Sequence, residues 1–310
     1  MEDAMKIFLT GGTGFVGRHL VNHLKSRGHD LVALVRRPGS LTGVREIVGD
    51  VTQPRTFPPD QLQGCEAVIH LVGISREDPA RKVTFPRLHV DAVRHVLEAC
   101  RQAGIRRYLH MSALGASHQS GAKYQRTKAQ AEDLVRVSGL DWTIFRPSVI
   151  IGPSGEFARL LVNLVKFRLT PLLGEGNYVL SPISIATMVR AFGNALENDI
   201  AIGKTYELGG DTITFRTLLE RISQTLERPV FFINIPVGLI RTLAGPLDRF
   251  AFMPITREQL IMLQEYRPPR DNAIYQELGL YYKSLEEVLH ENLAGGPLTE
   301  EALEEEQKEK

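Results

Sequence analysis

The stretch FLTGGTGFVGRHLVNHLKSRGHDLVALVRRPG, residues 8–39, decides the fold. An apolar run ends in glycines at positions 11, 12, 14 and 17, and a segment with Leu20, Val21 and Leu24 on one helical face follows directly. A second apolar run, DLVALV, ends at Arg36 and Arg37. Short apolar runs beside glycines indicate buried strands, and the spacing of the leucines indicates a helix. The stretch therefore predicts strand, glycine loop, helix and strand in that order.

The same alternation continues through the first half of the chain. Apolar runs at 67–73, 107–113 and 141–152 alternate with helix-prone segments at 88–104 and 123–139. Strands separated by helices pair in parallel through right-handed crossovers. We therefore predict an α/β fold, a doubly wound parallel sheet with helices on both faces.

The glycine loop indicates what this fold binds. Its glycines satisfy both G-x-x-G-x-x-G and G-x-G-x-x-G, with Thr13 inside the loop, between a predicted strand and a predicted helix. Without Cβ atoms the backbone can approach a pyrophosphate, whose charge is met by free N–H groups at the start of the helix. This motif in this context predicts a dinucleotide-binding site.

The end of the second strand bears on the choice of dinucleotide. NAD sites usually place Asp or Glu there for the ribose 2′-hydroxyl, whereas an arginine suits a 2′-phosphate. The chain instead has Arg36 and Arg37, with no acidic residue nearby. The alternative is that both are ordinary surface arginines that bind no ligand. We predict NADP, with NAD as the alternative. After the third predicted strand, Asp50 and Val51 lie in GDVT, where Asp50 either accepts a bond from adenine or caps a turn.

The candidate chemistry lies in YQRTK, residues 124–128. Residues four apart share a helix face, so Tyr124 and Lys128 address the same small volume. A phenol with its reference pKa of about 10 is a poor acid–base catalyst at neutral pH. A neighbouring ammonium lowers that pKa, so we expect Lys128 to make Tyr124 a usable proton donor and acceptor.

The chain resembles the short-chain dehydrogenase/reductase superfamily, extended or atypical branch. The resemblance is carried by TGGTGFVGRHLV, GDVT, HLVG, HVDAVRHVLEAC, YLHMSALGA, YQRTKAQAE and WTIFRPSVIIGP, in that order. It is similar in particular to the group that contains the nucleotide-binding accessory subunit of respiratory complex I and bacterial epimerase/dehydratase-like proteins. Residues 5–155 match well, and TYELGGDTITFRTLLERIS supports the match further on. The resemblance implies a Rossmann domain with a smaller C-terminal substrate lobe.

The resemblance also implies a place for each site residue. The pyrophosphate would be lined by Gly11, Gly14, Phe15, Val16 and Gly17. The adenosine end would be surrounded by Arg36, Asp50, Leu71, Val72 and Gly73. The nicotinamide end would be surrounded by Tyr124, Lys128, Pro147 and Val149.

Two departures from the family pattern concern catalysis. The Ser or Thr that family enzymes use to orient substrate falls at Ala113, one residue after Ser112, and His89 stands where many relatives carry Asn. Ser112 is our candidate for the orienting role beside Tyr124 and Lys128. If Ser112 does not serve, the protein binds cofactor and catalyses slowly or not at all.

Composition narrows the partners and the compartment. The 310 residues are 43% hydrophobic and 24% charged, with a net charge of +1, which argues against nucleic acid as a partner. Two cysteines, no signal-peptide pattern at MEDAMKIFLT and no apolar run long enough to span a bilayer predict a cytoplasmic protein. No His, Cys and Asp cluster has metal-ligand spacing, so we predict no metal.

The second half of the chain predicts a different organisation. We assign 1–152 to the NAD(P)-binding domain, 153–296 to an interleaved substrate-binding lobe and 297–310 to an acidic disordered tail. Residues 229–254 are unusually apolar and rich in proline, which suits an apolar substrate or a peripheral contact with a membrane or protein complex, although ordinary packing of the lobe would also explain them. The oligomeric state is left open.

Three functions fit these residues. The first is an NADP-dependent oxidoreductase acting on an apolar carbonyl or a quinone- or isoprenoid-type compound. The second is a sugar-nucleotide epimerase or dehydratase, which would use the same tyrosine and lysine with tightly held NAD. The third is a cofactor-holding subunit of a respiratory or other assembly, without catalysis. The retained Tyr124 and Lys128 favour the first, and Ala113 favours the third.

Overall fold

The computed structural model describes residues 4–166, 169–236 and 257–293. Two compact units alternate along the chain. The first comprises Met1–Pro147, Ala186–Leu208 and Asp271–Tyr281, and the second comprises Ser148–Ile185, Gly209–Arg270 and Tyr282–Lys310. Residues 237–254 of the apolar stretch and the predicted tail at 297–310 lie outside the described residues.

A seven-stranded parallel sheet forms the centre of the first unit, in the order β11-β6-β5-β4-β1-β2-β3. The strands are β1 Lys6–Thr10, β2 Asp30–Val35, β3 Arg45–Val48, β4 Ala67–His70, β5 Arg107–Met111, β6 Asp141–Pro147 and β11 Lys204–Leu208. The predicted doubly wound parallel sheet is therefore confirmed.

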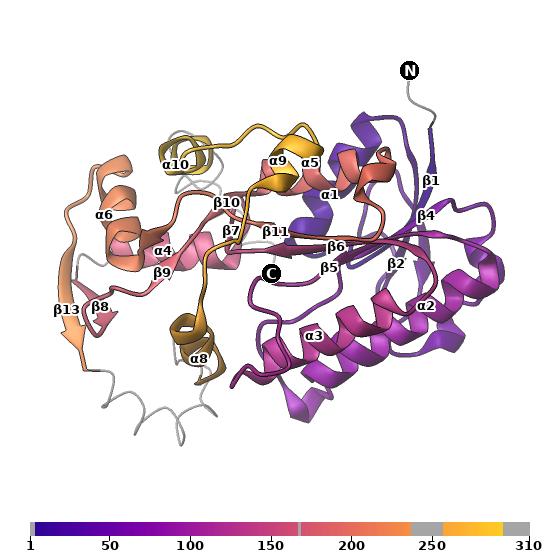
Figure 1. Cartoon of the computed structure of the whole chain (residues 1–310), viewed down its shortest axis with the longest axis horizontal. Helices are drawn as coiled ribbons and strands as arrows, with labels where there is room; N and C mark the ends of the chain where they lie inside the picture. Colours follow the sequence, from indigo (N-terminus) through magenta and orange to yellow (C-terminus); the bar gives the residue numbers. More distant parts are fainter. Residues whose placement is uncertain (1–3, 167–168, 237–256, 294–310) are drawn as a thin grey trace. The chain divides into compact units, whose positions relative to one another are not determined.

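Helices cover both faces of this sheet (Figure 1). They are α1 Phe15–Ser26, α2 Ala92–Ala103, α3 Lys123–Arg136, α5 Ile185–Leu196 and α9 Ala273–Glu277. Figure 1 shows α2 and α3 on one face and α1 and α5 on the other. Phe8, Val68 and Tyr108, from three adjacent strands, pack against Val93 and Val135 of α2 and α3 in a fully buried core. This core joins α2 and α3 to one face of the sheet.

Short 3-10 and π turns connect these elements. They are η1 Pro54–Thr56, η2 Pro59–Leu62, η3 Pro79–Arg81, the π-helical η4 Pro86–Asp91 and η5 Asp199–Ala201. The helix predicted at 88–104 thus begins as a wide π turn, which carries the buried His89. The strand predicted at 67–73 ends earlier, at His70, because the chain turns away at the carboxyl edge of the sheet.

The second unit contains four helices in its described part, α4 Glu156–Lys166, α6 Phe215–Thr225, α8 Arg257–Glu265 and α10 Leu285–Leu293. Three two-stranded sheets accompany them. These pair β7 Ile150–Ile151 with β10 Ile183–Ser184, β9 Val179–Leu180 with β12 Ile213–Thr214, and β8 Leu169–Leu173 with β13 Phe231–Ile235. A second core with Leu161, Leu218 and Val288 joins α4, α6 and α10.

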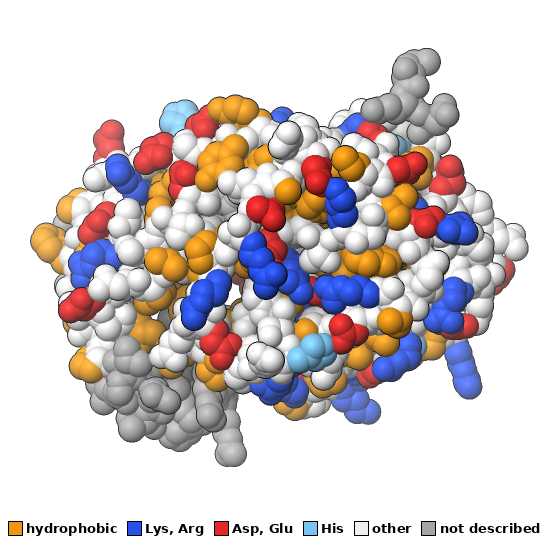
Figure 2. Space-filling view, in the orientation of Figure 1, with side chains coloured by type: hydrophobic (Ala, Val, Ile, Leu, Met, Phe, Trp, Pro, Cys, Tyr) orange, Lys and Arg blue, Asp and Glu red, His pale blue; other side chains and the backbone are white. Residues whose placement is uncertain are grey.

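The surface gives no sign of one dominant charge on the face drawn in Figure 2. Lys and Arg side chains alternate there with Asp and Glu side chains, as the net charge of +1 suggests. In the described ranges, no helix combines the length and the apolar character that crossing a bilayer requires.

Candidate cofactor and catalytic site

The glycine loop joins β1 to α1 and is shaped by close backbone contacts. Gly11 has φ +78°, a conformation that favours glycine, and a Cβ atom there would lie 3.0 Å from the backbone of Leu71 and Val72. At Gly17, a Cβ atom would lie 2.6 Å from Cα of Gly12 and would also overlap the carbonyl oxygen of Gly11. Gly17 therefore permits the helix to pack against the loop.

The start of α1 presents backbone donors. Gly14 is the N-cap, and Phe15 and Val16 occupy the first helical positions. Because a helix leaves its first N–H groups without intrahelical partners, this turn is suited to an anion. The roles of Phe15, Val16 and Gly17 toward a pyrophosphate stay predictions.

A cavity of about 690 Å³ lies at the carboxyl edge of the sheet in the first unit. Its lining brings together most of the predicted cofactor residues, namely Gly11, Thr13, Gly14, Arg36, Asp50, Val51, Leu71, Val72 and Gly73. Residues from four strand ends thus meet at one place, which is where ligands bind in open parallel sheets.

The two predicted arginines differ in their surroundings. Both are exposed, but Arg36 lines the cavity and Arg37 is not among its lining residues. Within residues 4–166, 169–236 and 257–293, the Arg36 guanidinium makes no hydrogen bond or ion pair. A cation in this position can accept an anionic group of a ligand without breaking a protein contact.

Asp50 caps a turn in the structure. Its Oδ1 accepts bonds from the backbone N–H and the hydroxyl of Thr52, each at 2.8 Å. Arg87 extends this chain, because its Nη2 donates to Thr52 Oγ1 at 2.9 Å. A contact of Asp50 with adenine stays a prediction.

Tyr124 and Lys128 lie one turn apart on α3, as predicted. Lys128 is only 3% exposed, and its Nζ donates to the Met111 carbonyl at 3.1 Å. A Cβ atom at Gly73 would lie 3.0 Å from this Nζ, so the ammonium is directly behind a residue of the cavity wall.

His89 links the cavity wall to α3. Its Nε2 lies 3.2 Å from the backbone N–H of Ile74, and its Nδ1 lies 2.9 Å from Thr127 Oγ1. The ring also packs edge-on against Tyr124, with centroids 5.3 Å apart. Burial lowers the pKa of His89 to about 2, so this contact is made by a neutral imidazole.

Burial also changes the acid–base properties of the predicted catalytic pair. It raises the pKa of Tyr124 to about 12, and it lowers the pKa of Lys128 to about 8 against the opposing effect of Glu132. The expected lowering of the tyrosine pKa by Lys128 is therefore wrong for this structure, because the cost of burying a phenolate is the larger effect.

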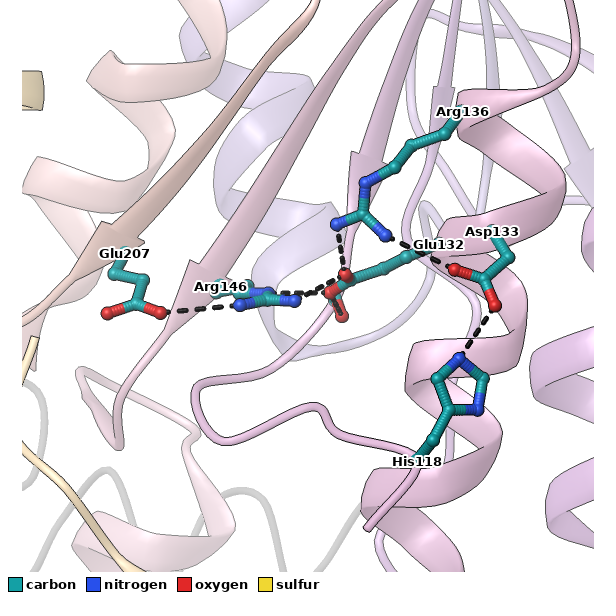
Figure 3. Close-up of polar contacts among 7 residues, drawn as sticks. His118, Glu132, Asp133, Arg136, Arg146 and Glu207 are labelled. Atoms are coloured by element: carbon teal, nitrogen blue, oxygen red, sulfur yellow. Dashed lines mark hydrogen bonds and ion pairs between the residues drawn. The ribbon is translucent and has the colours of Figure 1, made fainter. Parts of the chain in front are cut away.

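The Ser112 hydroxyl is directed to a buried carboxylate. Its Oγ donates to Glu132 Oε1 at 2.5 Å, and Glu132 is fully buried on α3. Figure 3 shows the ion pairs around Glu132: Arg146 lies between Glu132 and Glu207, and Arg136 lies between Glu132 and Asp133. An orienting role for Ser112 stays a prediction, although its hydroxyl proton is used in this network.

The remaining predicted residues are in different units. Pro147 ends β6 in the first unit, where its carbonyl accepts from Leu114 N–H at 2.9 Å. Val149 belongs to the second unit and bonds to Ile183 there. Among the described residues, no three His, Cys, Asp or Glu side chains are grouped as a metal site requires.

Sequence reasoning missed several residues of this region. Arg81, Lys82 and Arg87 line the cavity from the segment between β4 and α2, and His70 and His110 form a buried stack with Tyr108. Glu132 had one usable signal, its position four residues after Lys128 on the predicted helix. The others carry no local pattern: pairing of β4 with β5 brings the two histidines and Tyr108 together, and folding of the segment between β4 and α2 brings the basic residues to the cavity.

Comparisons with known proteins agree with this geometry. The pattern of an NAD(P)H-binding family matches residues 11–161. The chain is 30% identical to NADH dehydrogenase (ubiquinone) 1 alpha subcomplex subunit 9, mitochondrial, of Arabidopsis thaliana, over 93% of this chain and 75% of that protein. It is 28% identical to sterol demethylase protein B of Methylococcus capsulatus, over 80% of this chain and 84% of that protein.

Solved structures agree on the fold. UDP-glucose 4-epimerase of Thermotoga maritima superposes with a TM-score of 0.73, over 98% of this chain and all of that chain, at 19% identity. The glycine loop, the parallel sheet and these likenesses together confirm an NAD(P)-binding domain. The chain belongs to the protein family that includes this mitochondrial subunit of NADH dehydrogenase, and it carries the NAD(P)H-binding pattern over residues 11–161.

Proposed function

We propose that this protein is an NADP(H)-dependent oxidoreductase that acts on an apolar carbonyl or a quinone- or isoprenoid-type compound. The preference for NADP(H) is carried by one observation: Arg36 lines the cavity, and its guanidinium has no partner in the described ranges. A guanidinium binds phosphate with paired, charge-assisted hydrogen bonds. Arg81, Lys82 and Arg87 line the same cavity against one carboxylate, Asp50. This excess of positive charge supports a 2′-phosphate over a 2′-hydroxyl.

The catalytic part of the proposal assigns a role to Tyr124 and Lys128. With a pKa of about 12, the Tyr124 hydroxyl carries its proton at neutral pH. In this state the phenol can act as a donor to a carbonyl oxygen but not as a base, and reduction of a carbonyl is the direction that needs a donor. NADPH, when bound, supplies the hydride for the carbonyl carbon. Lys128 would donate to the nicotinamide ribose from behind Gly73.

Two observations support an apolar substrate. Phe231 and Ile233 on β13, within the apolar stretch 229–254, are 63% and 47% exposed. Residues two apart on a strand lie on the same face of it, so these side chains offer a small apolar surface to an apolar compound. A relative that matches most of this chain is named for a reaction of sterols, which are largely apolar compounds.

The cofactor preference is tested by the affinities of NADPH and NADH. We expect NADPH to bind more tightly, and Arg36→Ala to weaken NADPH by about 10- to 100-fold, the loss expected for one charge-assisted contact. NADH affinity should change little. Arg37→Ala is the matched control, because Arg37 is a neighbouring exposed arginine that does not line the cavity. Equal losses in the two variants, or no preference for NADPH, would contradict the assignment.

Turnover is tested with apolar carbonyl compounds and quinones, by following the consumption of NADPH. Tyr124→Phe should lower kcat by about 10²- to 10⁴-fold, because it removes the proposed proton donor and keeps the ring that packs against His89. Unchanged turnover in this variant would show that Tyr124 is not the donor.

A second candidate is favoured by the Ser112 contact. The Ser112 hydroxyl donates to Glu132, and the next residue is Ala113, so no free hydroxyl comes from these two positions. A relative of this chain is named as a subunit of NADH dehydrogenase. These observations support a cofactor-holding subunit without catalysis, in contact with a protein complex or the surface of a membrane. An inactive wild-type chain that gains turnover in Ala113→Ser would favour this candidate.

A further inference from the structure

Glu132 lies on the same face of α3 as Lys128, one turn later. Its carboxylate is fully buried and accepts four hydrogen bonds. Oε1 accepts from Ser112 Oγ at 2.5 Å and from Arg146 Nε at 2.8 Å. Oε2 accepts from Nη2 of Arg146 and from Nη2 of Arg136, each at 2.6 Å (Figure 3). A carboxylate with this many charge-assisted bonds has one defined position.

The donors to Glu132 come from the elements that carry the predicted nicotinamide end. Arg146 is the last residue of β6 before Pro147, and Ser112 directly follows β5. Lys128 reaches the same point of β5, because its Nζ donates to the carbonyl of Met111, the neighbour of Ser112. Two adjacent residues at the end of β5 are thus bonded to two residues one turn apart on α3.

The surroundings of Lys128 contain little negative charge. Lys128 acts electrostatically on His70 of β4, His110 of β5 and His89 of η4, and burial lowers the pKa of each imidazole so that all three are neutral. Glu132 is the anion that opposes the effect of burial on the Lys128 pKa. Arg136 and Arg146 offset part of its charge, although Arg146 is shared with Glu207 at 3.3 Å.

We infer that Glu132 is a positioning residue for Lys128: it fixes α3 against the ends of β5 and β6, and it places a buried negative charge one turn from the ammonium on the same helix face. The relevance of this role to turnover rests on the proposed function, but the role itself concerns only the folded chain. The same role explains why the Ser112 hydroxyl donates to the Glu132 carboxylate.

The test is the titration of Lys128, followed by NMR of the full chain carrying ¹³Cε-labelled lysine, without cofactor. Lys128→Met identifies the signal. Glu132→Gln keeps the shape of the side chain and removes its charge, so the Lys128 pKa should fall by about 1 unit below its wild-type value. Glu207→Gln is the matched control, because it removes a carboxylate from the same network without touching the bonds to Glu132, and it should leave the Lys128 pKa unchanged.

A second variant covers the case in which Glu132→Gln does not fold. Glu132→Gln combined with Arg136→Gln removes one charge of each sign, and the Lys128 pKa should still fall. An unchanged Lys128 pKa in whichever of these two variants folds would overturn the inference, as would an equal fall in Glu207→Gln. The pH dependence of NADPH binding is measured in parallel: its alkaline limb should move to lower pH with Glu132→Gln. A chain that prefers NADH would contradict the proposed function and leave the titration result intact.

Discussion

Arg36 and Lys128 are both cations at the cofactor cavity, but they are held in opposite ways. Arg36 is exposed at the end of β2 and has no partner in the described part of the chain. Lys128 is 3% exposed behind Gly73, among neutral imidazoles, a backbone carbonyl and Glu132. The exposed cation is available for a ligand and contributes little to folding. The buried cation depends on the fold, because its charge is costly away from water.

The largest expected effect concerns the buried network. Arg146→Ala would leave the fully buried Glu132 without two of its four hydrogen bonds. The free energy of unfolding should fall by about 3 to 5 kcal/mol, as when one partner of a buried ion pair is removed. Urea denaturation measures this loss. Arg106→Ala is the control, since the Arg106–Asp141 pair is largely exposed and screened by water, so its loss should change the free energy of unfolding far less. Similar losses of stability in Arg146→Ala and Arg106→Ala would contradict the contrast between buried and exposed charges.

The next effect concerns the charge of Lys128 and depends on pH. Burial lowers its pKa from 10.5 to about 8, so between these values the unfolded chain binds more protons than the folded chain. The contribution of this group to stability is therefore fully present above pH 10.5 and is lost as pH falls through about 8. The free energy of unfolding changes by at most about 3 kcal/mol over this range. Lys128→Met should be more stable than wild type at pH 7, and this advantage should shrink by pH 9.5. If the denaturation midpoints of Lys128→Met and wild type differ by the same amount at pH 7 and pH 9.5, this prediction is wrong.

A smaller loss is expected in the glycine loop. In Gly17→Ala the new Cβ atom would meet the backbone of Gly11 and Gly12, and overpacking of this kind costs about 1 to 3 kcal/mol. In Gly14→Ala the nearest atom is the Gly11 carbonyl oxygen at 3.3 Å, which requires only a slight shift. Thermal unfolding should separate the two variants. NADPH binding should be lost in Gly17→Ala, because the loop and the helix can no longer pack as they do.

The smallest effect on stability is expected at the exposed Arg36. Arg36→Ala should change the free energy of unfolding by less than about 0.5 kcal/mol, since no described protein contact is removed. Its NADPH affinity should nevertheless fall. A marked loss of stability would mean that Arg36 serves the fold, and the comparison with Lys128 would then fail.

Much of this site is visible in local sequence patterns. The apolar runs and glycines predict β1, α1 and β2 and place Arg36 at a strand end, and the spacing of Tyr124 and Lys128 places them on one helix face. The other site residues cannot be predicted locally, because they are far apart in the sequence. Glu132 is 20 residues from Ser112 and 14 from Arg146, and nothing local indicates that these three side chains meet.

The sequence by itself therefore determined the order of strands and helices, the glycine loop and the residues available for catalysis, because these depend on periodicity and on neighbours along the chain. Only the tertiary structure decided what state those residues are in. Burial raises the pKa of Tyr124 and lowers that of Lys128, and the Ser112 hydroxyl turns to Glu132. The reason is physical: desolvation and hydrogen bonding depend on which distant segments pack together, and that packing is set by the pairing of the strands and the helices that cover them.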